Sequence, residues 1–538
     1  MSRTIKIPKK LSKKSLNLIF NIFLLIYLIF GFYLSINTGI STDEFIEQTN
    51  WKLSKDAIKN FFGLNNHGYS NLYSYEWKFH GVGHHYFSQV YLSFISLFIH
   101  IDKYSEDVSN ILINHSFIFL IYFFSGIFSK KIVEFVIEDK LFSNIFLIFY
   151  LLYPYLLGHG FYNPKDIPFL FIWILSSYIS IKIFLKLYKK KEISILNILV
   201  LSLTTGILLS IRISGILIIL QYFIIFIITC NAIEKTFYEI IKSYFYKIIL
   251  FFFLTLLVTF SLYPVLWNNP LLVLDSINQM RNIPYGVCTL TFGKCMDALN
   301  LPSSYIFIWL FFKLPILALI GLLLFPFVEK KIFTKSRNQI ILGSIMLSTI
   351  SIIFLLILLE VNLYDELRHI MFLVPLILIS TYSIIYLFSK KITLYIGILS
   401  ITIFLIQNFN MYPYQYTWFN LFGNFVNINN NFELDYWGVS GRNIAKKINT
   451  NTEINKINDK CIYVSPKHIV EPFINNNYNC VKPYFSIYPK SSEKFVLVKY
   501  TRNIRRENPS GCKLIFVEEY NLNFVKKNLK MGEVYICN

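Results

Sequence analysis

Eleven apolar stretches constrain this chain more than any other feature of its sequence. Each is close to the roughly 20 residues with which an α-helix crosses the hydrocarbon core of a bilayer. They lie at about 16–38, 110–129, 141–158, 167–185, 194–211, 213–230, 248–266, 304–327, 339–360, 369–388 and 392–409. We expect an α-helical polytopic membrane protein with about 11 transmembrane helices, because backbone exposed to lipid must satisfy its hydrogen bonds internally.

Basic clusters between these stretches predict how the chain is oriented. The N-terminal tail, residues 1–15, is rich in Lys and Arg. If this tail is cytoplasmic, every second loop should also be basic. Those loops do hold clusters, namely Lys130-Lys131, Lys189-Lys190-Lys191, Lys235 with Lys242 and Lys247, Lys330-Lys331 with Lys335 and Arg337, and Lys390-Lys391. The pattern predicts an N-terminus inside and a C-terminus outside.

The net charge of +20 comes largely from these loops and the tail. The chain is 55% hydrophobic and only 15% charged, which is far more apolar than a soluble domain. Because Lys and Arg are spread over short loops and do not form one basic face, we expect the lipid bilayer as a partner and no nucleic acid.

Two apolar segments allow a different interpretation. The first stretch could be a cleaved signal peptide, but its apolar run is too long and no small-residue cleavage site follows it. Residues 86–101 could be a further span, yet counting them would invert every later loop. We expect an interfacial helix there, on the outer leaflet and within one outer loop at 39–109.

The last part of the chain differs in composition. From Asn424 onward, short apolar runs alternate with Asn, Pro, Ser and Gly clusters, which is typical of a small α/β or α+β domain. We expect a transmembrane domain at 16–410, a second outer loop at 267–303, and an extracytoplasmic domain at 411–538. Six cysteines fall on the predicted outer side, and their positions in the sequence are compatible with disulfides and with free thiols. The spacing in CTLTFGKC would allow a disulfide that closes a short loop.

Ionisable residues collect at the outer ends of the predicted spans. Asp43 and Glu44 follow the first span, although residues at this junction could simply be solvated or cap the next helix. The connection YPYLLGHGFYNPKDIPF holds His159, Lys165 and Asp166, which an ordinary polar turn would also explain. All five side chains are predicted to face one compartment.

Three further residues are predicted on the same side. Arg212, in LLSIRISGIL, has apolar neighbours on both sides, and such an arginine either snorkels or meets an anion. Arg368 and His369 stand at the outer end of the tenth stretch. Cations beside carboxylates near lipid head groups suit a reaction with a lipid phosphate as leaving group. A channel or exchanger would need ionisable groups inside the spans, which are almost free of them.

These motifs together resemble the class C integral-membrane glycosyltransferases, in particular the group of protein O-mannosyltransferases and lipid A aminoarabinose transferases. The resemblance covers roughly residues 16–445. It rests on the acidic pair after the first span, NPKDIPF (163–169), the arginine of LSIRISG (209–215), YPVLW (263–267), LRHIMFLVP (367–375) and FELDYWGVS (432–440).

The resemblance implies that a monosaccharide is transferred, with inversion, from a polyprenyl-phosphate-linked donor to a hydroxyl of a protein, lipid or glycan. Asp43 would be the general base with Glu44 beside it. The site would face the periplasm or exterior of a bacterial inner or plasma membrane. The residues expected to bind the donor phosphate or substrate are Arg212, Arg368, His369, Lys165, Asp166 and His159. A lipid-linked oligosaccharide ligase and a lipid or sugar transporter (flippase) are the alternatives.

Three histidines stand where many members of that group have a His-Pro-Pro stretch. The segment KFHGVGHHYF holds His80, His84 and His85. The spacing of His80 and His84 would suit a metal site on a helix, but Gly81 and Gly83 disfavour a helix and no third ligand is evident. We expect contacts with the loop or the substrate there and no cofactor, with a divalent metal site as the alternative.

Overall fold

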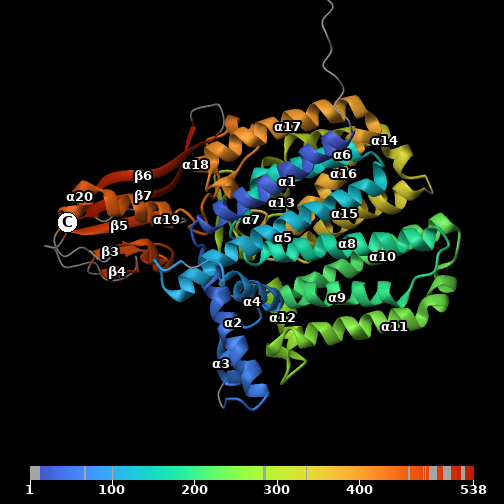
Figure 1. Cartoon of the computed structure of the whole chain (residues 1–538), viewed down its shortest axis with the longest axis horizontal. Coiled ribbons are helices and arrows are strands. Elements are labelled where there is room, and N and C mark those ends of the chain that lie inside the picture. Colours follow the sequence, from blue (N-terminus) through green and yellow to red (C-terminus); the bar gives the residue numbers. More distant parts are fainter. Residues whose placement is uncertain are drawn as a thin grey trace, which may run out of the picture.

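The structure is a computed structural model, and it describes residues 13–65, 68–99, 101–282, 286–334, 336–457, 461–475, 478, 480–483, 494–500, 511–522 and 527–537. Most of the basic N-terminal tail and Lys335 lie outside these ranges. Long helices run side by side in a bundle, and a small β-sheet lies at one end of it (Figure 1).

Each apolar stretch of the sequence forms helix. Within the described residues, eight helices are long and apolar enough to cross a membrane, or up to ten if each of two bent pairs is one span. The eight are α1 (Lys13–Ile36), α5 (Glu106–Val136), α8 (Asp166–Tyr188), η1 with α10 (Ile213–Leu217, Ile218–Ile233), α11 (Phe237–Ser261), η4 with α15 (Gln339–Gly343, Ser344–Leu358), η5 with α16 (Arg368–Leu373, Val374–Phe388) and α17 (Lys390–Met411). A shorter apolar helix is α9 (Ile195–Ile211).

Two stretches that the sequence predicts as single spans are bent. The first is α6 (Lys140–Leu152) with α7 (Pro154–Gly160), at 62°, and the second is α13 (Ser304–Lys313) with α14 (Ile316–Ile332), at 114°. Tyr153 and Leu314, the residues at the two breaks, are both extended and both precede a proline. Proline disfavours the helical conformation of the residue before it, so each first helix ends there.

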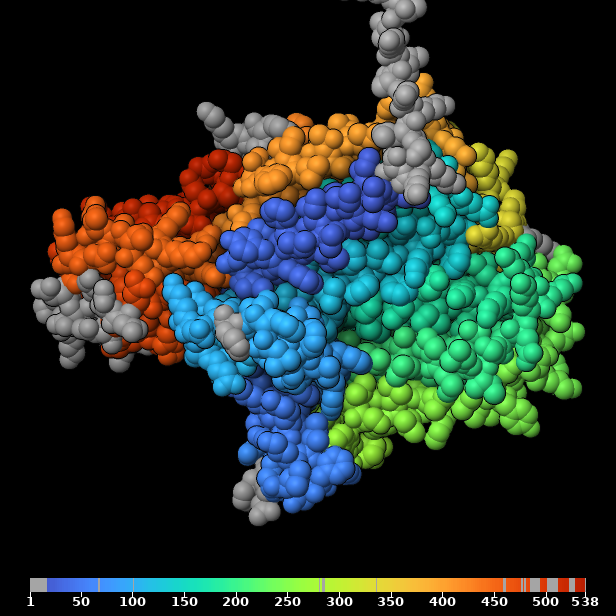
Figure 2. Space-filling model, in the orientation of Figure 1, coloured from blue at the N-terminus to red at the C-terminus, as the bar shows by residue number. Residues whose placement is uncertain are grey.

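The outer surface of the bundle is apolar. Helix α1 lies on the outside of the bundle (Figure 2), and its side chains Leu18, Ile29 and Tyr33 are each at least 60% exposed. The helix formed by residues 368–388 is central, and 89% of its apolar 18-residue segment is buried inside the bundle. Long apolar helices with exposed apolar faces are what an integral membrane protein needs, because lipid can cover those faces.

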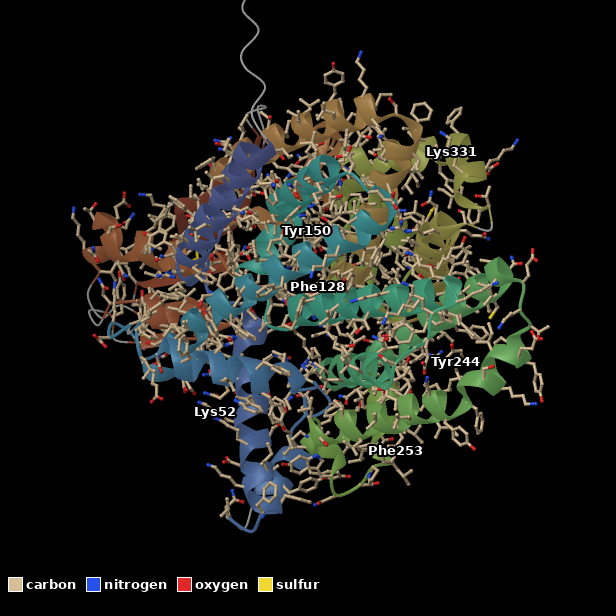
Figure 3. The ribbon with its side chains drawn as sticks, turned by 45° about the vertical axis from the view of Figure 1, so that its right-hand side comes forward. Lys52, Phe128, Tyr150, Tyr244, Phe253 and Lys331 are labelled. Atoms are coloured by element: carbon tan, nitrogen blue, oxygen red, sulfur yellow. A yellow bond between two sulfur atoms is a disulfide. The ribbon has the colours of Figure 1, made fainter. Side chains whose placement is uncertain are left out.

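One end of the bundle carries four further helices. There α2 (Thr42–Phe61) and α3 (Gly68–Ser74) run crosswise to the long helices, beside α4 (Gly83–Ile95) and α12 (Leu272–Arg281) (Figure 1). Lys52 of α2 and Lys331 of α14 lie towards opposite ends of the molecule (Figure 3). Helix α4 covers most of the apolar segment that the sequence predicts as an interfacial helix.

The region after α17 contains short helices and a mixed sheet, where the sequence predicts a small α/β or α+β domain. The strand order of the sheet is β4-β3-β5-β7-β6, with β3 parallel to β4 and β5 and with β7 antiparallel to β5 and β6. The elements are α18 (Ile428–Asn431), α19 (Gly441–Thr450), α20 (Thr452–Asn455), β3 (Cys461–Val464), β4 (Cys480–Lys482), β5 (Phe495–Tyr500), β6 (Cys512–Leu522) and β7 (Lys527–Cys537). This sheet lies at the same end of the bundle as α2 (Figure 1).

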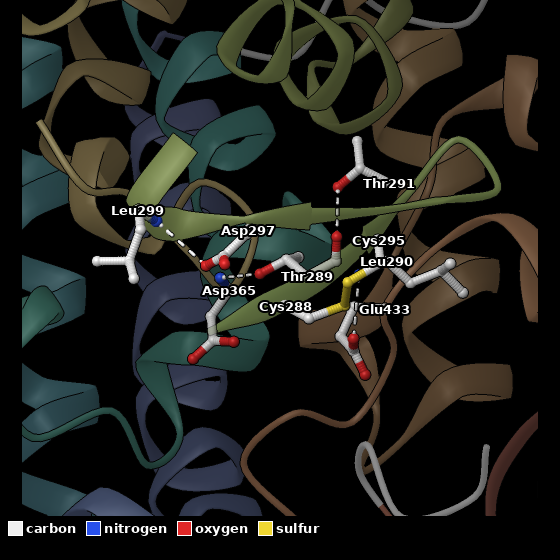
Figure 4. Close-up of a disulfide and its surroundings, with 9 residues drawn as sticks. All are labelled: Cys288, Thr289, Leu290, Thr291, Cys295, Asp297, Leu299, Asp365 and Glu433. Atoms are coloured by element: carbon white, nitrogen blue, oxygen red, sulfur yellow. Dashed lines mark hydrogen bonds between the residues drawn. A yellow bond between two sulfur atoms is a disulfide. The ribbon is translucent and has the colours of Figure 1, made fainter. Parts of the chain in front are cut away.

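Six cysteines form three disulfides, and Cys230 is free and buried. The pairs are Cys288–Cys295, Cys461–Cys480 and Cys512–Cys537. The first closes the hairpin of β1 (Cys288–Thr291) and β2 (Lys294–Asp297), shown in Figure 4. In that hairpin the Thr289 hydroxyl accepts a hydrogen bond from the Asp365 backbone, and the Leu290 backbone donates one to Glu433. The hairpin therefore joins the segment before η5 to the segment before the sheet.

Candidate functional site

The first ion pair of the site joins α2 to η5. Asp43 lies in the first turn of α2, and Arg368 is the first residue of η5. Arg368 Nη1 donates to Asp43 Oδ2 at 2.7 Å, while its guanidinium lies over the rings of Tyr364 and Trp437 and its Nε donates to His369 Nε2. The arginine side chain is 6% exposed and the Asp43 side chain 29% exposed, so the carboxylate is the accessible partner.

Glu44 faces away from these cations. Its Oε2 accepts a 2.6 Å hydrogen bond from the Ser41 backbone, and the two residues form a capping box at the start of α2. Its Oε1 lies 2.7 Å from His115 Nε2 on α5. Glu44 therefore secures the N-terminus of α2 and joins this helix to the bundle.

The second ion pair joins α8 to the break between α9 and η1. Arg212 is the extended residue at that break, and its Nη2 lies 2.5 Å from Asp166 Oδ1. Asp166 is positioned by Asn163, whose side chain accepts from the backbone of Lys165 and Asp166 and donates to Asp166 Oδ2 at 2.9 Å. The NPKD sequence thus forms an Asx-type turn that places a buried carboxylate at the start of α8.

The third ion pair uses Glu47, which no motif in the sequence singles out. Lys165 Nζ lies 2.8 Å from Glu47 Oε1, and His80 Nδ1 lies 2.9 Å from the same oxygen. Although burial raises the pKa of Glu47, the ammonium of Lys165 and the contact with His80 hold it well below its ordinary value. Burial lowers the pKa of Lys165, and Glu47 opposes that shift. Glu47 is four residues after Asp43, a spacing that puts both carboxylates on one face of a helix.

His159 reaches this site only indirectly. It is fully buried in α7, its Nδ1 lies 3.2 Å from Asn163 Nδ2, and its ring packs against those of Tyr155, Tyr162 and Trp437. It therefore supports the turn that holds Asp166. His369 accepts a hydrogen bond from Arg368 Nε, and the centroid of its ring lies 4.5 Å from that of the Tyr364 ring.

The motif FELDYWGVS fixes the start of α2. The backbone oxygen of Trp437 accepts hydrogen bonds from both the backbone and the hydroxyl of Thr42, at 3.0 and 3.1 Å. The motif is held in turn by Asp435, which accepts from the backbones of Val439 and Ser440. Because Thr42 precedes Asp43, the sheet region and the proposed base are directly connected.

A second residue that no motif in the sequence singles out is Lys313. It pairs with Glu366 at 2.9 Å, both side chains are fully buried, and Glu366 is two residues before Arg368. Burial raises the pKa of Glu366 to about 7. Asp365 and Glu366 both have left-handed backbones, with φ of 57° and 65°. Such strained conformations gather at functional sites and need firm support, which the buried pair provides.

Besides Lys313, these contacts give three cations, each held by a carboxylate from another element. Guanidinium and ammonium groups bind phosphate through charge-assisted hydrogen bonds. A partly exposed carboxylate such as Asp43 can accept a proton from a hydroxyl. Among the described residues, Glu47, His84 and His85 also form a group that could hold a metal ion.

No protein-family model matches this sequence, and no curated protein sequence matches it.

Proposed function

We propose that this protein is a membrane glycosyltransferase of the class C type. It transfers a monosaccharide from a polyprenyl phosphate to a hydroxyl of a protein, lipid or glycan on the outer face of the membrane, with inversion. The observation that carries the proposal is the ion pair of Asp43 with Arg368, together with the ion pairs of the two other buried cations, Lys165 with Glu47 and Arg212 with Asp166.

In the proposed reaction, the donor phosphate binds Arg368 and Arg212. Because the phosphate competes with Asp43 for Arg368, donor binding frees the carboxylate to accept a proton. The acceptor hydroxyl gives its proton to Asp43, and its oxygen forms a bond with the anomeric carbon. The bond between that carbon and the phosphate oxygen breaks, and the leaving phosphate keeps the electron pair beside the two arginines.

The proposed topology has eleven spans, counting each bent pair as one and including α9. The basic loops place the N-terminus in the cytoplasm and α2, the hairpin β1–β2 and the C-terminal sheet outside. The three disulfides support this side, because disulfides persist in oxidising compartments and not in the cytoplasm. In a bacterium the site would face the periplasm or the exterior.

The experiment is an incubation of the purified protein with a panel of polyprenyl-phosphate monosaccharides and hydroxyl acceptors, with release of polyprenyl phosphate as the readout. We expect release with at least one donor, dependent on an acceptor. Release of polyprenyl diphosphate from a lipid-linked oligosaccharide would indicate a ligase. Movement of lipid across liposomes without any release would indicate a transporter, and either result would contradict the proposal.

A further inference from the structure

Six buried side-chain atoms on α2 and α4 have no hydrogen-bond partner within the described protein, and four of them belong to three neighbouring residues. These four are Glu47 Oε2, His85 Nε2, and both ring nitrogens of His84. One ligand atom from each of these three residues lies within 4.8 Å of the other two, and Glu47 Oε2 lies 3.8 Å from His85 Nε2. Buried polar atoms are almost always paired, so such a cluster requires an explanation.

The carboxylate of Glu47 is divided between two sets of neighbours. Its Oε1 contacts Lys165 and His80, as in the third ion pair, whereas its Oε2 lies 3.8 Å from His85 Nε2. The first two contacts fix the plane of the carboxylate. Metal-ligating side chains are commonly oriented by such contacts with neighbouring groups that do not themselves touch the metal.

The fold holds the histidine pair firmly against this carboxylate. His84 and His85 lie in the first turn of α4, which begins at Gly83. A Cβ on Gly81 would lie 2.1 Å from the Ser210 backbone oxygen, and one on Gly83 would lie 1.9 Å from the Ser210 hydroxyl. The two glycines, which in the sequence disfavour a helix, instead let the start of α4 pack against the end of α9.

We propose that Glu47, His84 and His85 bind one divalent transition-metal ion, with Zn²⁺ the best match. Two imidazoles and one carboxylate are a common zinc ligand set, and three protein ligands leave a fourth position open. Glu47 and His85 also line a cavity of about 230 Å³, with Trp51, Gln89 and Asn114 on its wall. The ion could enter the site through this cavity, and the cavity has room for a water molecule or an anion at the fourth coordination position.

Lys165 is a nearby cation, but it does not occupy the proposed site. Its ammonium contacts Oε1, and the ion would be held by Oε2 on the other side of the carboxylate. The ion would link α2 to α4 beside the proposed phosphate-binding residues. This inference concerns metal binding alone and stands whether or not the protein transfers a sugar.

The test measures metal on the purified full chain, carrying an affinity tag without histidine. We expect elemental analysis to find about one zinc per chain. After chelator treatment, the protein should take up one Zn²⁺ in competition with a chromophoric chelator. Replacement by Co²⁺ should give a visible spectrum of a nitrogen-ligated site. A wild-type chain that contains no zinc and takes none up would overturn the proposal.

Variants identify the ligands. His84→Ala, His85→Ala and Glu47→Gln should each abolish stoichiometric uptake, whereas the control His468→Gln, in the sheet region, should keep it. His80→Gln should keep one ion with about 10–100-fold weaker affinity, because it changes a contact that orients Glu47. Unchanged zinc content in folded His84→Ala and His85→Ala would sink the proposal. If these variants do not fold, X-ray absorption of the wild-type zinc protein decides, since fewer than two imidazoles would contradict it.

Discussion

At the scale of single residues, the adjacent carboxylates of α2 have separate tasks. Successive residues of an α-helix point about 100° apart. Asp43 accordingly reaches Arg368, while Glu44 reaches Ser41 and His115. The sequence places both acids at the start of a helix, but it does not show which neighbour each one meets, because those neighbours come from distant parts of the chain.

The division between these two acids leads to a prediction about Glu44. Glu44→Gln can keep the capping contact but removes the charge beside buried His115, so we expect a loss of about 1–3 kcal/mol in stability. Turnover of the folded protein should stay close to that of wild type. Thermal unfolding in detergent measures the first effect, and Glu76→Gln, at an exposed residue, is the control. Unchanged stability with lost turnover would instead give Glu44 a role in the chemistry.

At the scale of elements, the proposed phosphate ligands stand where helices break. Arg212 ends α9, and Arg368 begins η5. Arg212 is visible in the sequence as an isolated arginine between two apolar stretches, and Arg368 is visible as a residue at the outer end of the tenth stretch. Glu47 and Lys313 are harder to identify, because the first looks like a polar residue of an amphipathic helix and the second like a basic residue at a span end. Their importance comes from tertiary contacts alone.

Lysine substitutions test the arginines with little damage to the buried pairs. Arg212→Lys and Arg368→Lys keep the charge next to Asp166 and Asp43, but they lose the paired donors of the guanidinium. We expect donor affinity and turnover to fall together by roughly tenfold or more, since a hydrogen bond to a charged group contributes about 1.5–3 kcal/mol.

The matched control for these two variants is Arg281→Lys at the end of α12, which should change neither quantity. Binding of a labelled polyprenyl-phosphate sugar and steady-state turnover are the measurements. Unchanged donor affinity in both arginine variants would exclude them from the phosphate site.

At the scale of the whole molecule, the sequence predicts the location of the helices better than their geometry. Apolar runs of spanning length identify all the long apolar helices, because lipid imposes that length and composition. The bends at Tyr153 and Leu314 are not predicted, although a proline follows each, because a proline can also be accommodated within a straight span. The Cys288–Cys295 disulfide closes the short loop that the spacing in CTLTFGKC allows, whereas the pairing of the other four cysteines follows from the three-dimensional arrangement.

Topology can be tested by labelling single cysteines in sealed vesicles, in a Cys230→Ser background. Asn300→Cys, between β2 and α13, should react with an impermeant thiol reagent from outside. Lys189→Cys, at the end of α8, should react only from inside or after permeabilisation. Labelling of Lys189→Cys from outside would reverse the orientation and place the candidate site in the cytoplasm.

The most direct test of the central claim is turnover of Asp43→Asn. The N-cap of α2 is Ser41, so this substitution keeps the helix start and the size of the side chain and removes the base together with the negative charge beside Arg368. We expect donor binding to survive and turnover to fall by about 10²–10⁴, the usual contribution of a general base. Asp275→Asn, at an exposed residue of α12, is the matched control. Near-normal turnover in folded Asp43→Asn would contradict the assignment of Asp43 as the base.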